Sequence, residues 1–530
     1  MLHENSAEEF AASEGEQRAA PTPVDVGPAN TKTVVSDDHR RDATWDLSQG
    51  PRNYVSLVST QIASAALSFA AVWLATRLLG SSGYGGVVAI VAASQAIGQL
   101  AVNWTAVSLW RWGLEEFVAT GRVSKAFWTR FWVFLPNVLL VVVTSRLWWP
   151  FLSSLLNLPP QAYLFVLGHF LANALWVHVQ QGLQGAKLMR LQGGLLTFER
   201  ILIFLVVLSC ALSGKASFLA VALAYVVGPL GACAAGLWRL RKLIFPVVGL
   251  DRPLLKQMLT FSLPVLPASL VGYLSGSYLD AFFITHYLSG ADLGVYAVAY
   301  HVAGIGLQLP LLVGSVLLPL FVTLQAEGQF DRAERFMHNA LPFLTLLWGI
   351  ACALAATIGG YLFPLIFGEQ FRGLGPLLWP LMAAAALAGP VLMGYTPFSN
   401  SKFATYIAMV GAIASAFVNV LLNYLLIPSF GLVGCAWATT ASYGVNTLAV
   451  VLLVHWRLLS GRPWTIQALS PIVLGAMFAS LYTVNFMALA ATLLLSAVLM
   501  LLHRKSVTVG FRMLKNFQRG GGEAESLAKT

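Results

Sequence analysis

The sequence has few charged residues and long apolar stretches, and together these exclude a soluble protein. Only 10% of the 530 residues are charged, whereas 57% are hydrophobic and the mean hydropathy is +0.72. A soluble chain of this composition would expose large apolar patches and aggregate. We therefore expect an all-α polytopic membrane protein, because a helix of about 20 apolar residues crosses the hydrocarbon core of a bilayer.

Sequence motifs for catalysis are also missing. There is no G-x-x-x-x-G-K-[ST] phosphate loop, no H-E-x-x-H zinc motif and no pair of carboxylates suited to sugar chemistry. The four cysteines have neither disulfide nor metal spacing. The longest loop, 239–260, leaves no room for a soluble catalytic domain. We therefore expect no enzyme, cofactor or metal site.

Fourteen apolar stretches are long enough to be membrane spans. Their approximate cores are 54–76, 87–108, 127–149, 161–183, 195–213, 217–238, 261–288, 293–323, 339–367, 375–397, 403–427, 431–456, 467–484 and 487–502. The last two are separated only by Asn485 and its apolar neighbours, so they form either a tight hairpin or one long tilted helix.

The distribution of positive charge predicts the orientation of the spans. If the N-terminus is cytoplasmic, 28 of the 32 lysines and arginines lie in the inner loops and tails, Arg130 among them. The outer loops then keep Arg77, Arg146, Lys215 and Arg372. We therefore place both termini in the cytoplasm. The net charge of +10 reflects this bias and predicts no nucleic-acid partner.

An internal repeat predicts two halves of parallel topology. The segment Thr76–Ala89 resembles Thr285–Val298, six spans later, with Gly85 matching Gly294. Duplicated halves around a central cavity are typical of transporters. The expected division is a disordered cytoplasmic tail (1–50), an N-terminal six-helix bundle (51–245), a C-terminal six-helix bundle (246–458), two extra transmembrane helices (459–503) and a basic cytoplasmic tail (504–530).

Three stretches carry a family resemblance: Leu78–Gly85; Phe261–Leu270, which leads to Tyr278–Ile284 and Leu293–Ala299; and Asn419–Thr439. With them, residues 52–503 resemble the polysaccharide-transport, or O-antigen-type, flippases of the multidrug/oligosaccharidyl-lipid/polysaccharide (MOP) exporter superfamily. The resemblance implies alternating access in a bacterial inner membrane. It implies a cargo of undecaprenyl-pyrophosphate-linked oligosaccharide repeat units for lipopolysaccharide or exopolysaccharide synthesis, and polysaccharide-assembly proteins as partners.

Polar residues within the spans recur at helical spacing, so they share helix faces that must point to protein or water. The candidates for a substrate cavity are Gln95, Gln99 and Asn103 in span two, His169, Asn173, Gln180 and Gln184 in span four, and Tyr300 and Gln308 in span eight. Hydrogen bonding between helices is the alternative role for each residue.

Charged and titratable residues in or near the spans are candidates for pyrophosphate binding and ion coupling. Asp280, with His286 and His301, is the candidate for coupling transport to H⁺ or Na⁺, and its place predicts a meeting with Arg77 across the cavity. A structural ion pair or an interfacial carboxylate is the alternative role for Asp280. The pyrophosphate candidates are Arg77, Arg146, Arg111, Arg190, Arg200 and Lys256, with Arg111 preferred on the inner side because tryptophans flank it. Glu199 and Arg200 are expected to pair with their helix neighbours.

Two other functions compete with the lipid-linked oligosaccharide flippase. One is a cation-coupled small-molecule exporter or a peptidoglycan lipid-precursor flippase, and the other is a membrane-embedded polymerase or ligase. The short outer loops argue against the polymerase or ligase, because such an enzyme would carry catalytic Arg or His there.

Overall fold

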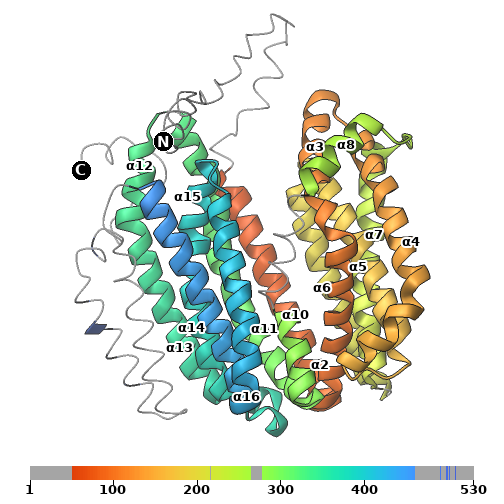
Figure 1. Cartoon of the computed structure of the whole chain (residues 1–530), viewed down its shortest axis with the longest axis vertical. Helices are drawn as coiled ribbons and strands as arrows, with labels where there is room; N and C mark the ends of the chain where they lie inside the picture. Colours follow the sequence, from red (N-terminus) through yellow and green to blue (C-terminus); the bar gives the residue numbers. More distant parts are fainter. Residues whose placement is uncertain are drawn as a thin grey trace, which may run out of the picture. The chain divides into compact units, whose positions relative to one another are not determined.

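The computed structural model of the chain describes residues 50–214, 216–263, 277–326 and 328–459, with single positions between 490 and 508. The predicted tails, Lys215 and nearly all of the last two predicted spans lie outside these residues. The described part consists of helices and short turns, with no strand in it (Figure 1). The prediction of an all-α polytopic protein is therefore confirmed. Contacts divide the chain into Met1–Arg52 and Asn53–Thr530, and the packing below concerns the second unit.

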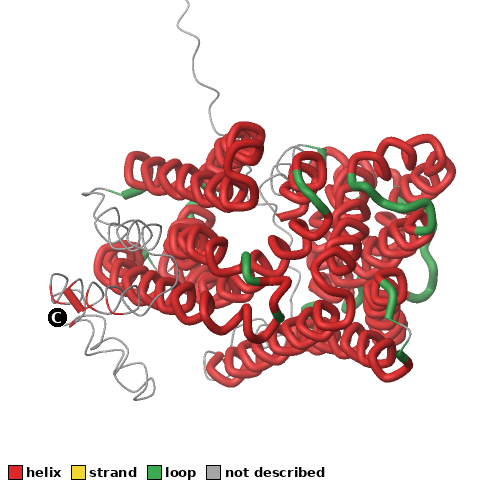
Figure 2. The backbone as a smooth tube through the Cα atoms, turned by 90° about the horizontal axis from the view of Figure 1, so that it is seen from below, coloured by secondary structure: helices red, strands yellow, loops and turns green. Residues whose placement is uncertain are grey.

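The helices follow one another with few residues between them. The N-terminal helices are α2 (Gly50–Ala101), η1 (Asn103–Thr105), α3 (Ala106–Thr120), α4 (Ser124–Leu155), α5 (Ala162–Gly185), α6 (Met189–Ser213) and α7 (Phe218–Ile244), followed by α8 (Arg252–Ser262). The C-terminal helices are α10 (Ser277–Tyr287), α11 (Gly290–Ala326), α12 (Phe330–Arg335), η2 (Phe336–Ala340), α13 (Leu341–Phe367), η3 (Glu369–Phe371), α14 (Leu374–Pro390), η4 (Val391–Tyr395), α15 (Thr396–Ser401) and α16 (Tyr406–Arg457). Figure 2 shows many of them end-on.

Nine helical segments in the described part are long and apolar enough to cross a membrane, and two of them each hold two predicted spans. As straight rods, α2 and α16 would be about 78 Å long, far more than a bilayer core of ~30 Å requires. Each is instead interrupted by a glycine with non-helical torsions, Gly80 (φ 67°, ψ −174°) and Gly431 (φ 57°, ψ −139°). The two arms of α16 fold back on each other, because Gly411 lies against Asn446 and Val450.

The helices pack mainly with neighbours of their own group. Helices α3, α4, α5, α6 and α7 contact one another, with α7 touching α4, α5 and α6. Helix α14 contacts α11, α13 and α16 (Figure 1). Helix α8 packs on α3 and α4, although the expected division begins the second bundle at residue 246. That division of the chain into bundles stays a prediction.

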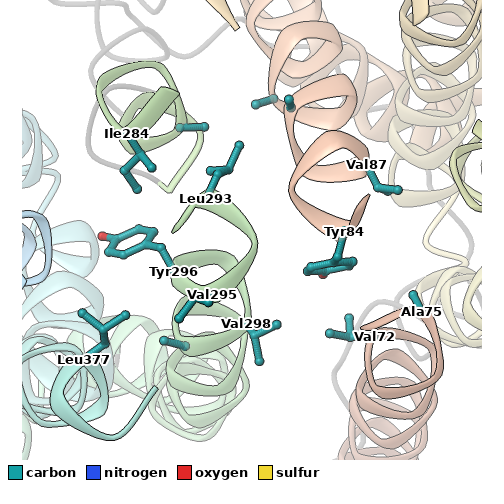
Figure 3. Packing of buried hydrophobic residues seen from close by; sticks show 14 of the residues in the cluster. Val72, Ala75, Tyr84, Val87, Ile284, Leu293, Val295, Tyr296, Val298 and Leu377 are labelled. Atoms are coloured by element: carbon teal, nitrogen blue, oxygen red, sulfur yellow. The ribbon is translucent and has the colours of Figure 1, made fainter. Parts of the chain in front are cut away.

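The largest cluster of buried apolar residues joins the two groups of helices. It includes Val72, Tyr84 and Val87 from α2 and Leu293 and Val298 from α11. Figure 3 shows Tyr84 and Val298 on facing sides, whereas the hydroxyl of Tyr296 points away from α2. The apolar contact therefore occupies the α2–α11 interface, while α11 turns a polar group toward the other C-terminal helices.

Two glycines that match in the internal repeat allow α2 and α11 to touch backbone to backbone. A Cβ atom on Gly85 would overlap the carbonyl oxygen of Gly290, and one on Gly294 would overlap the carbonyl oxygen of Ser81. Ser81 and Gly290 are themselves matching positions of the repeat. The two contacts are thus related by the symmetry of the repeat, and neither position tolerates a side chain without separating the helices.

We predict that Gly85→Ala destabilises the closed α2–α11 contact by about 1–3 kcal/mol, the usual cost of overpacking. The measurement is the thermal unfolding midpoint of the purified protein in detergent. Gly304→Ala is the matched control, because Gly304 lies on the same α11 with open space around its Cβ position. An equal midpoint for Gly85→Ala and Gly304→Ala would contradict the tight crossing.

Helix α8 is fixed to α4 through an aspartate outside the membrane-spanning helices. Asp251 accepts a hydrogen bond from the backbone N–H of Leu254 (2.8 Å) and thereby caps the N-terminus of α8. The ammonium of Lys125 lies 2.7 Å from the other carboxylate oxygen. The hydrogen bond from Lys125, followed by that from Leu254, holds the pKa of the Asp251 carboxyl below its usual value.

A carboxyl whose pKa is lowered by folding stabilises the protein above its unfolded pKa of about 4 and loses this contribution as the pH falls through its folded pKa. We expect Asp251→Asn, whose side chain still caps α8, to lower the free energy of unfolding by about 0.5 kcal/mol at pH 7. Asp251→Ala should lower it by about 1–2 kcal/mol. Thermal unfolding at pH 7 and pH 3 measures both. The Asp251→Asn deficit should shrink as the pH falls below about 4, and a deficit of the same size at pH 7 and pH 3 would refute the ion-pair contribution.

Candidate functional site

Asp280 is buried among neutral donors from three helices. Its side chain is 1% exposed and lies on α10. Tyr296 of α11 donates its hydroxyl to Oδ2 at 2.6 Å, and Thr439 of α16 donates to the same oxygen at 3.1 Å. Asn423, also of α16, donates its amide to Oδ1 at 2.8 Å. Within the described residues no lysine or arginine forms an ion pair with this carboxylate.

The surroundings of Asp280 are rich in oxygen atoms and contain one unused acceptor. Asn423 donates also to Oδ1 of Asn419 (3.1 Å), and its own Oδ1 is buried without a hydrogen-bond partner. Asn423 and Thr439 lie on opposite arms of α16, so the reversal at Gly431 is what brings them together. Carboxylate, amide and hydroxyl oxygens are ligands for hard cations, and a carboxylate without a counter-ion is also a natural proton acceptor.

The polar stripes of α2 and α5 meet in part. Asn173 of α5 donates to Gln95 of α2 at 3.5 Å, and Asn103 donates to Gln99 at 3.3 Å. His169 is 4% exposed and bonds through Nδ1 to the Ser94 hydroxyl. Gln180 and Gln184 are half-buried on the same helix. The predicted stripe therefore divides into a buried histidine between helices and amides that remain partly accessible.

Arg200 of α6 lies where N-terminal and C-terminal helices come together. Its guanidinium is within electrostatic range of two imidazoles, His169 of α5 and His301 of α11. His301 in turn lies 3.4 Å from the hydroxyl of Ser68 on α2. The side chain of Arg200 is 34% exposed, and its Nη1 is 3.8 Å from Oε1 of Glu199. Glu199 and Arg200 thus approach each other, and their expected pairing with helix neighbours stays a prediction.

Arg77 and Trp73 attach α2 to the C-terminal end of α13. Arg77 donates to the carbonyl oxygens of Ile366 (2.8 Å) and Leu365 (2.9 Å). The indole N–H of Trp73 also donates to the carbonyl oxygen of Ile366 (3.0 Å). A cation suits this end because the last carbonyls of a helix lack partners. The expected meeting of Arg77 with Asp280 is absent, since each side chain bonds elsewhere.

Further bonds join the two groups of helices at the same ends. The backbone N–H of Ser81 donates to Gln370 at 3.0 Å. Asn157, just after α4, donates to the carbonyl oxygen of Thr285 at 2.9 Å, and the Thr285 hydroxyl donates to that of Leu155 at 3.1 Å. Together with the Arg77 and Trp73 bonds, these contacts form what we call the end seal, defined by Trp73, Arg77, Ser81, Asn157, Thr285, Ile366 and Gln370.

The remaining predicted residues lie apart from these clusters. Arg111 is half exposed, pairs with Glu115 (3.6 Å) and lies over the rings of Trp112 and Phe261. His286 is exposed and packs against Tyr287. Tyr300 is half-buried with its ring 6.1 Å from that of Tyr296, and Gln308 is exposed. Of the pyrophosphate candidates, Arg146, Arg190 and Lys256 are exposed on the surface.

The placement of Arg130 in an inner loop is wrong. Arg130 lies within α4 and is 1% exposed. It donates to the carbonyl oxygen of Thr105 (3.1 Å) and to Nδ1 of His178 (2.5 Å). The helical path breaks at Val102, between α2 and η1, and Thr105 follows as the N-cap of α3. Arg130 adds a hydrogen bond to the Thr105 carbonyl oxygen, which also accepts one from the Ser108 hydroxyl, and no pattern in the sequence indicated this contact.

Tyr296, Asn423 and Thr439 also escaped assignment as site residues. The i, i+4 spacing of Asn419 and Asn423 in a span was the available signal. Spacing alone did not connect that face with Asp280, because the contact joins separate spans.

These features define a transporter-type, multi-pass membrane protein. The chain belongs to the family of polysaccharide biosynthesis proteins, which residues 51–325 match. The lipid II flippase MurJ in an inward closed conformation has a similar fold, with a TM-score of 0.61, 15% identity and coverage of 87% of this chain and 99% of that one. An inward-facing MATE family multidrug transporter of the MOP superfamily has a similar fold too, with a TM-score of 0.59, 15% identity and coverage of 79% of this chain and 99% of that one. No curated protein matches. The fold is therefore that of the MOP superfamily.

We predict that Arg77→Gln weakens the end seal by about 1 kcal/mol, because two bonds to helix carbonyls are lost at a partly exposed site. The expected result is roughly fivefold faster maleimide labelling of a cysteine placed at Ser81, which is 8% exposed. Arg146→Gln, a change of the same kind at an exposed arginine, should leave the labelling rate unchanged. Identical rates for the two variants would exclude Arg77 from the seal.

Proposed function

We propose that this protein moves undecaprenyl-pyrophosphate-linked oligosaccharide repeat units from the inner to the outer leaflet of the bacterial inner membrane by alternating access. Membership of the polysaccharide biosynthesis family supports a role in making surface polysaccharide or exopolysaccharide. The observation that carries the proposal is Arg200 of α6, because its guanidinium is partly exposed and lies 3.8 Å from Glu199, so that it keeps donors for an anion.

This arginine suits the chemistry of such a cargo. A diphosphate needs a cationic, donor-rich partner, and the planar fork of arginine binds phosphate oxygens in pairs. The partly accessible amides of Gln95 and Asn173 offer hydrogen bonds to sugar hydroxyl groups. Transport of this kind requires binding and release only, with no bond of the cargo broken.

The end seal supports a mechanism of alternating access. With both termini in the cytoplasm, the predicted topology puts the C-terminal end of α13 and the interruption of α2 at Gly80 on the outer side. In that topology the end seal would close the outer side of the protein. Outward opening would require the bonds of Arg77 and Trp73 to break, which exchanges them for bonds to water.

Asp280 is proposed as the coupling site for H⁺ or Na⁺. Its carboxylate has no ionic partner in the described residues, and the buried Oδ1 of Asn423 is a spare oxygen ligand beside it. A bound cation or proton would neutralise a charge that is otherwise costly within a membrane. Because α10, α11 and α16 all contribute to the site, its occupancy would alter the packing of the C-terminal helices.

A second candidate is the transport of a peptidoglycan lipid precursor or of a small molecule coupled to a cation. The similarity in fold to the lipid II flippase favours the first of these, and that to the MATE transporter favours the second. A diphosphate cargo would use Arg200 in either flippase, whereas a cationic drug would be repelled by it. The nature of the accumulated lipid distinguishes the cargoes.

We expect cells lacking this protein to accumulate lipid-linked repeat units on the inner leaflet, where a membrane-impermeant sugar-cleaving probe cannot reach them in spheroplasts. The wild-type protein should restore access. Arg200→Gln should slow translocation roughly 10- to 100-fold, as expected when a charged hydrogen-bond donor to phosphate is lost. Asp280→Asn should abolish the dependence of translocation on an ion gradient.

Two control variants match these changes. Arg190→Gln lies on the same α6 at an exposed position, and Asp292→Asn changes a carboxylate that accepts hydrogen bonds from Ser289. Both should translocate like wild type. Repeat units that already face outward in cells without the protein would refute the flippase and favour a polymerase or ligase.

A further inference from the structure

Lysines and arginines without acidic partners gather at one end of the N-terminal helices. They come from the turn between α3 and α4, from the last turns of α7 and from α8, and all of them are exposed. Within the described residues none of them forms an ion pair. We call this set the basic surface, and it consists of Arg122, Arg239, Arg241, Lys242, Arg252 and Lys256.

Hydrogen bonds hold the elements that carry the basic surface together. The backbone N–H of Val123 donates to the carbonyl oxygen of Leu243 at 3.1 Å, which joins the α3–α4 turn to α7. The indole N–H of Trp128 donates to the carbonyl oxygen of Ile244 at 2.7 Å. The ion pair of Asp251 with α4 fixes the start of α8. The backbone positions of the six cations relative to one another are therefore set by the fold.

The acidic residues near the basic surface are engaged elsewhere. Glu116 accepts hydrogen bonds from the backbone N–H groups of Lys125 (2.8 Å) and Ala126 (2.7 Å). Asp251 caps α8 and pairs with Lys125, and Glu115 pairs with an arginine of its own helix. The positive charge of the basic surface is thus available to an anion from outside the chain.

The same end of the helices exposes large apolar side chains. The loop between α7 and α8 exposes Phe245, Val247 and Leu250, and Trp238 of α7 is exposed too. The guanidinium carbon of Arg241 lies 3.6 Å from the centre of the Trp238 ring, a cation–π contact. Exposed apolar groups are unfavourable in water, whereas mixed aromatic and basic groups suit the headgroup region of a bilayer. The composition of this end therefore favours a membrane boundary.

The basic surface lies at the end of the N-terminal helices opposite the end seal. Helix α4 begins at Ser124, directly after the turn that holds Arg122, and the carbonyl oxygen of Leu155 at its far end accepts the hydrogen bond from Thr285 of the end seal. Its 32 residues span about 48 Å, more than a bilayer core requires. Figure 1 shows α3 and α8 together at one end of these helices. The predicted topology assigns this end to the inner leaflet.

The described C-terminal helices carry no comparable cluster on the side that the predicted topology makes cytoplasmic. In α12 the acidic residues Asp331 and Glu334 alternate with Arg332 and Arg335. Lys402 lies 3.5 Å from Glu334 and forms an ion pair with it. Among the described residues the unpaired positive charge is therefore concentrated on the N-terminal helices.

We propose that the basic surface binds the anionic headgroups of the phospholipids around the protein, with the loop of residues 245–250 inserted between them. Lysine and arginine donate hydrogen bonds to phosphate oxygens, and their attraction to an anionic leaflet adds up over neighbouring cations. The apolar side chains of the loop contact the first acyl carbons, as those of interfacial helices do. This contact would hold the N-terminal helices at the inner leaflet, whatever cargo the protein carries.

The test measures which lipid contacts the loop in the full-length protein. Gly249→Cys places an exposed thiol in the loop, where a Cβ atom meets open space, and the four native cysteines are buried. The thiol carries a maleimide fluorophore, and the protein is reconstituted in phosphatidylcholine nanodiscs with a small fraction of spin-labelled phosphatidylglycerol or spin-labelled phosphatidylcholine. Because a nitroxide quenches only nearby fluorophores, the two quenching curves report the local concentration of each lipid.

We expect phosphatidylglycerol to be enriched roughly five- to tenfold over phosphatidylcholine at the loop in low salt. High salt should reduce the enrichment, because it screens exposed charges. Arg252→Gln combined with Lys256→Gln removes two exposed cations of α8 and should lower the enrichment roughly threefold or more. Arg332→Gln combined with Arg335→Gln removes the same charge from exposed positions of α12 and should leave it unchanged. Melting curves in neutral detergent verify that both double variants are folded.

Three results would overturn the proposal. The first is equal quenching by the two lipids in low salt. The second is an equal loss of enrichment in the two double variants, because the contact would then reflect only the net charge of the protein. The third is quenching by neither lipid while iodide in the water quenches the fluorophore, which would place the loop away from the bilayer and favour an acidic protein as its partner.

Discussion

The close crossing of α2 and α11 is the contact on which the rest of this protein depends. At Gly85 and Gly294 the backbones touch without side chains between them, and the matching residues Ser81 and Gly290 complete the contact. This approach brings Ser68 within reach of His301 and carries Trp73 to the end of α13. Side chains at either glycine would separate the helices and with them the polar groups that meet at the junction.

The low polarity of the bilayer determines how the buried charges are arranged. Asp280, Arg130 and Glu199 are the aspartate, glutamate and arginine side chains found buried in the described chain, and each is stabilised differently. Asp280 receives neutral hydrogen bonds, Arg130 donates to the carbonyl oxygen of Thr105 at the start of α3, and Glu199 accepts from the indole of Trp176 with Arg200 3.8 Å away. In each case polar partners offset the cost of burying the charge away from water.

Apolar length and a few glycines made most of the helices predictable. Spans three to six correspond to α4, α5, α6 and α7 within a few residues, because an apolar stretch in a membrane has helix as its main option. The positions of Asp280 and of the Asn419–Asn423 face were evident as unusual polarity in apolar segments. Their mutual contact was not, since it depends on the reversal at Gly431 and on the packing of α10 against α16.

Arg130 and Arg77 show where inference from sequence failed. Counting charges placed Arg130 in a loop, yet it lies buried in α4 and bonds Thr105 and His178. The outer ends of spans one and seven, which are equivalent in the repeat, placed Arg77 near Asp280, yet Arg77 bonds carbonyl oxygens at the end of α13. By itself the sequence determined the membrane class, the helices and the repeat, because these follow from local apolar length and spacing. Tertiary structure alone decided which polar groups share a site, because hydrogen bonds and charge pairs act over a few ångströms between helices distant along the chain.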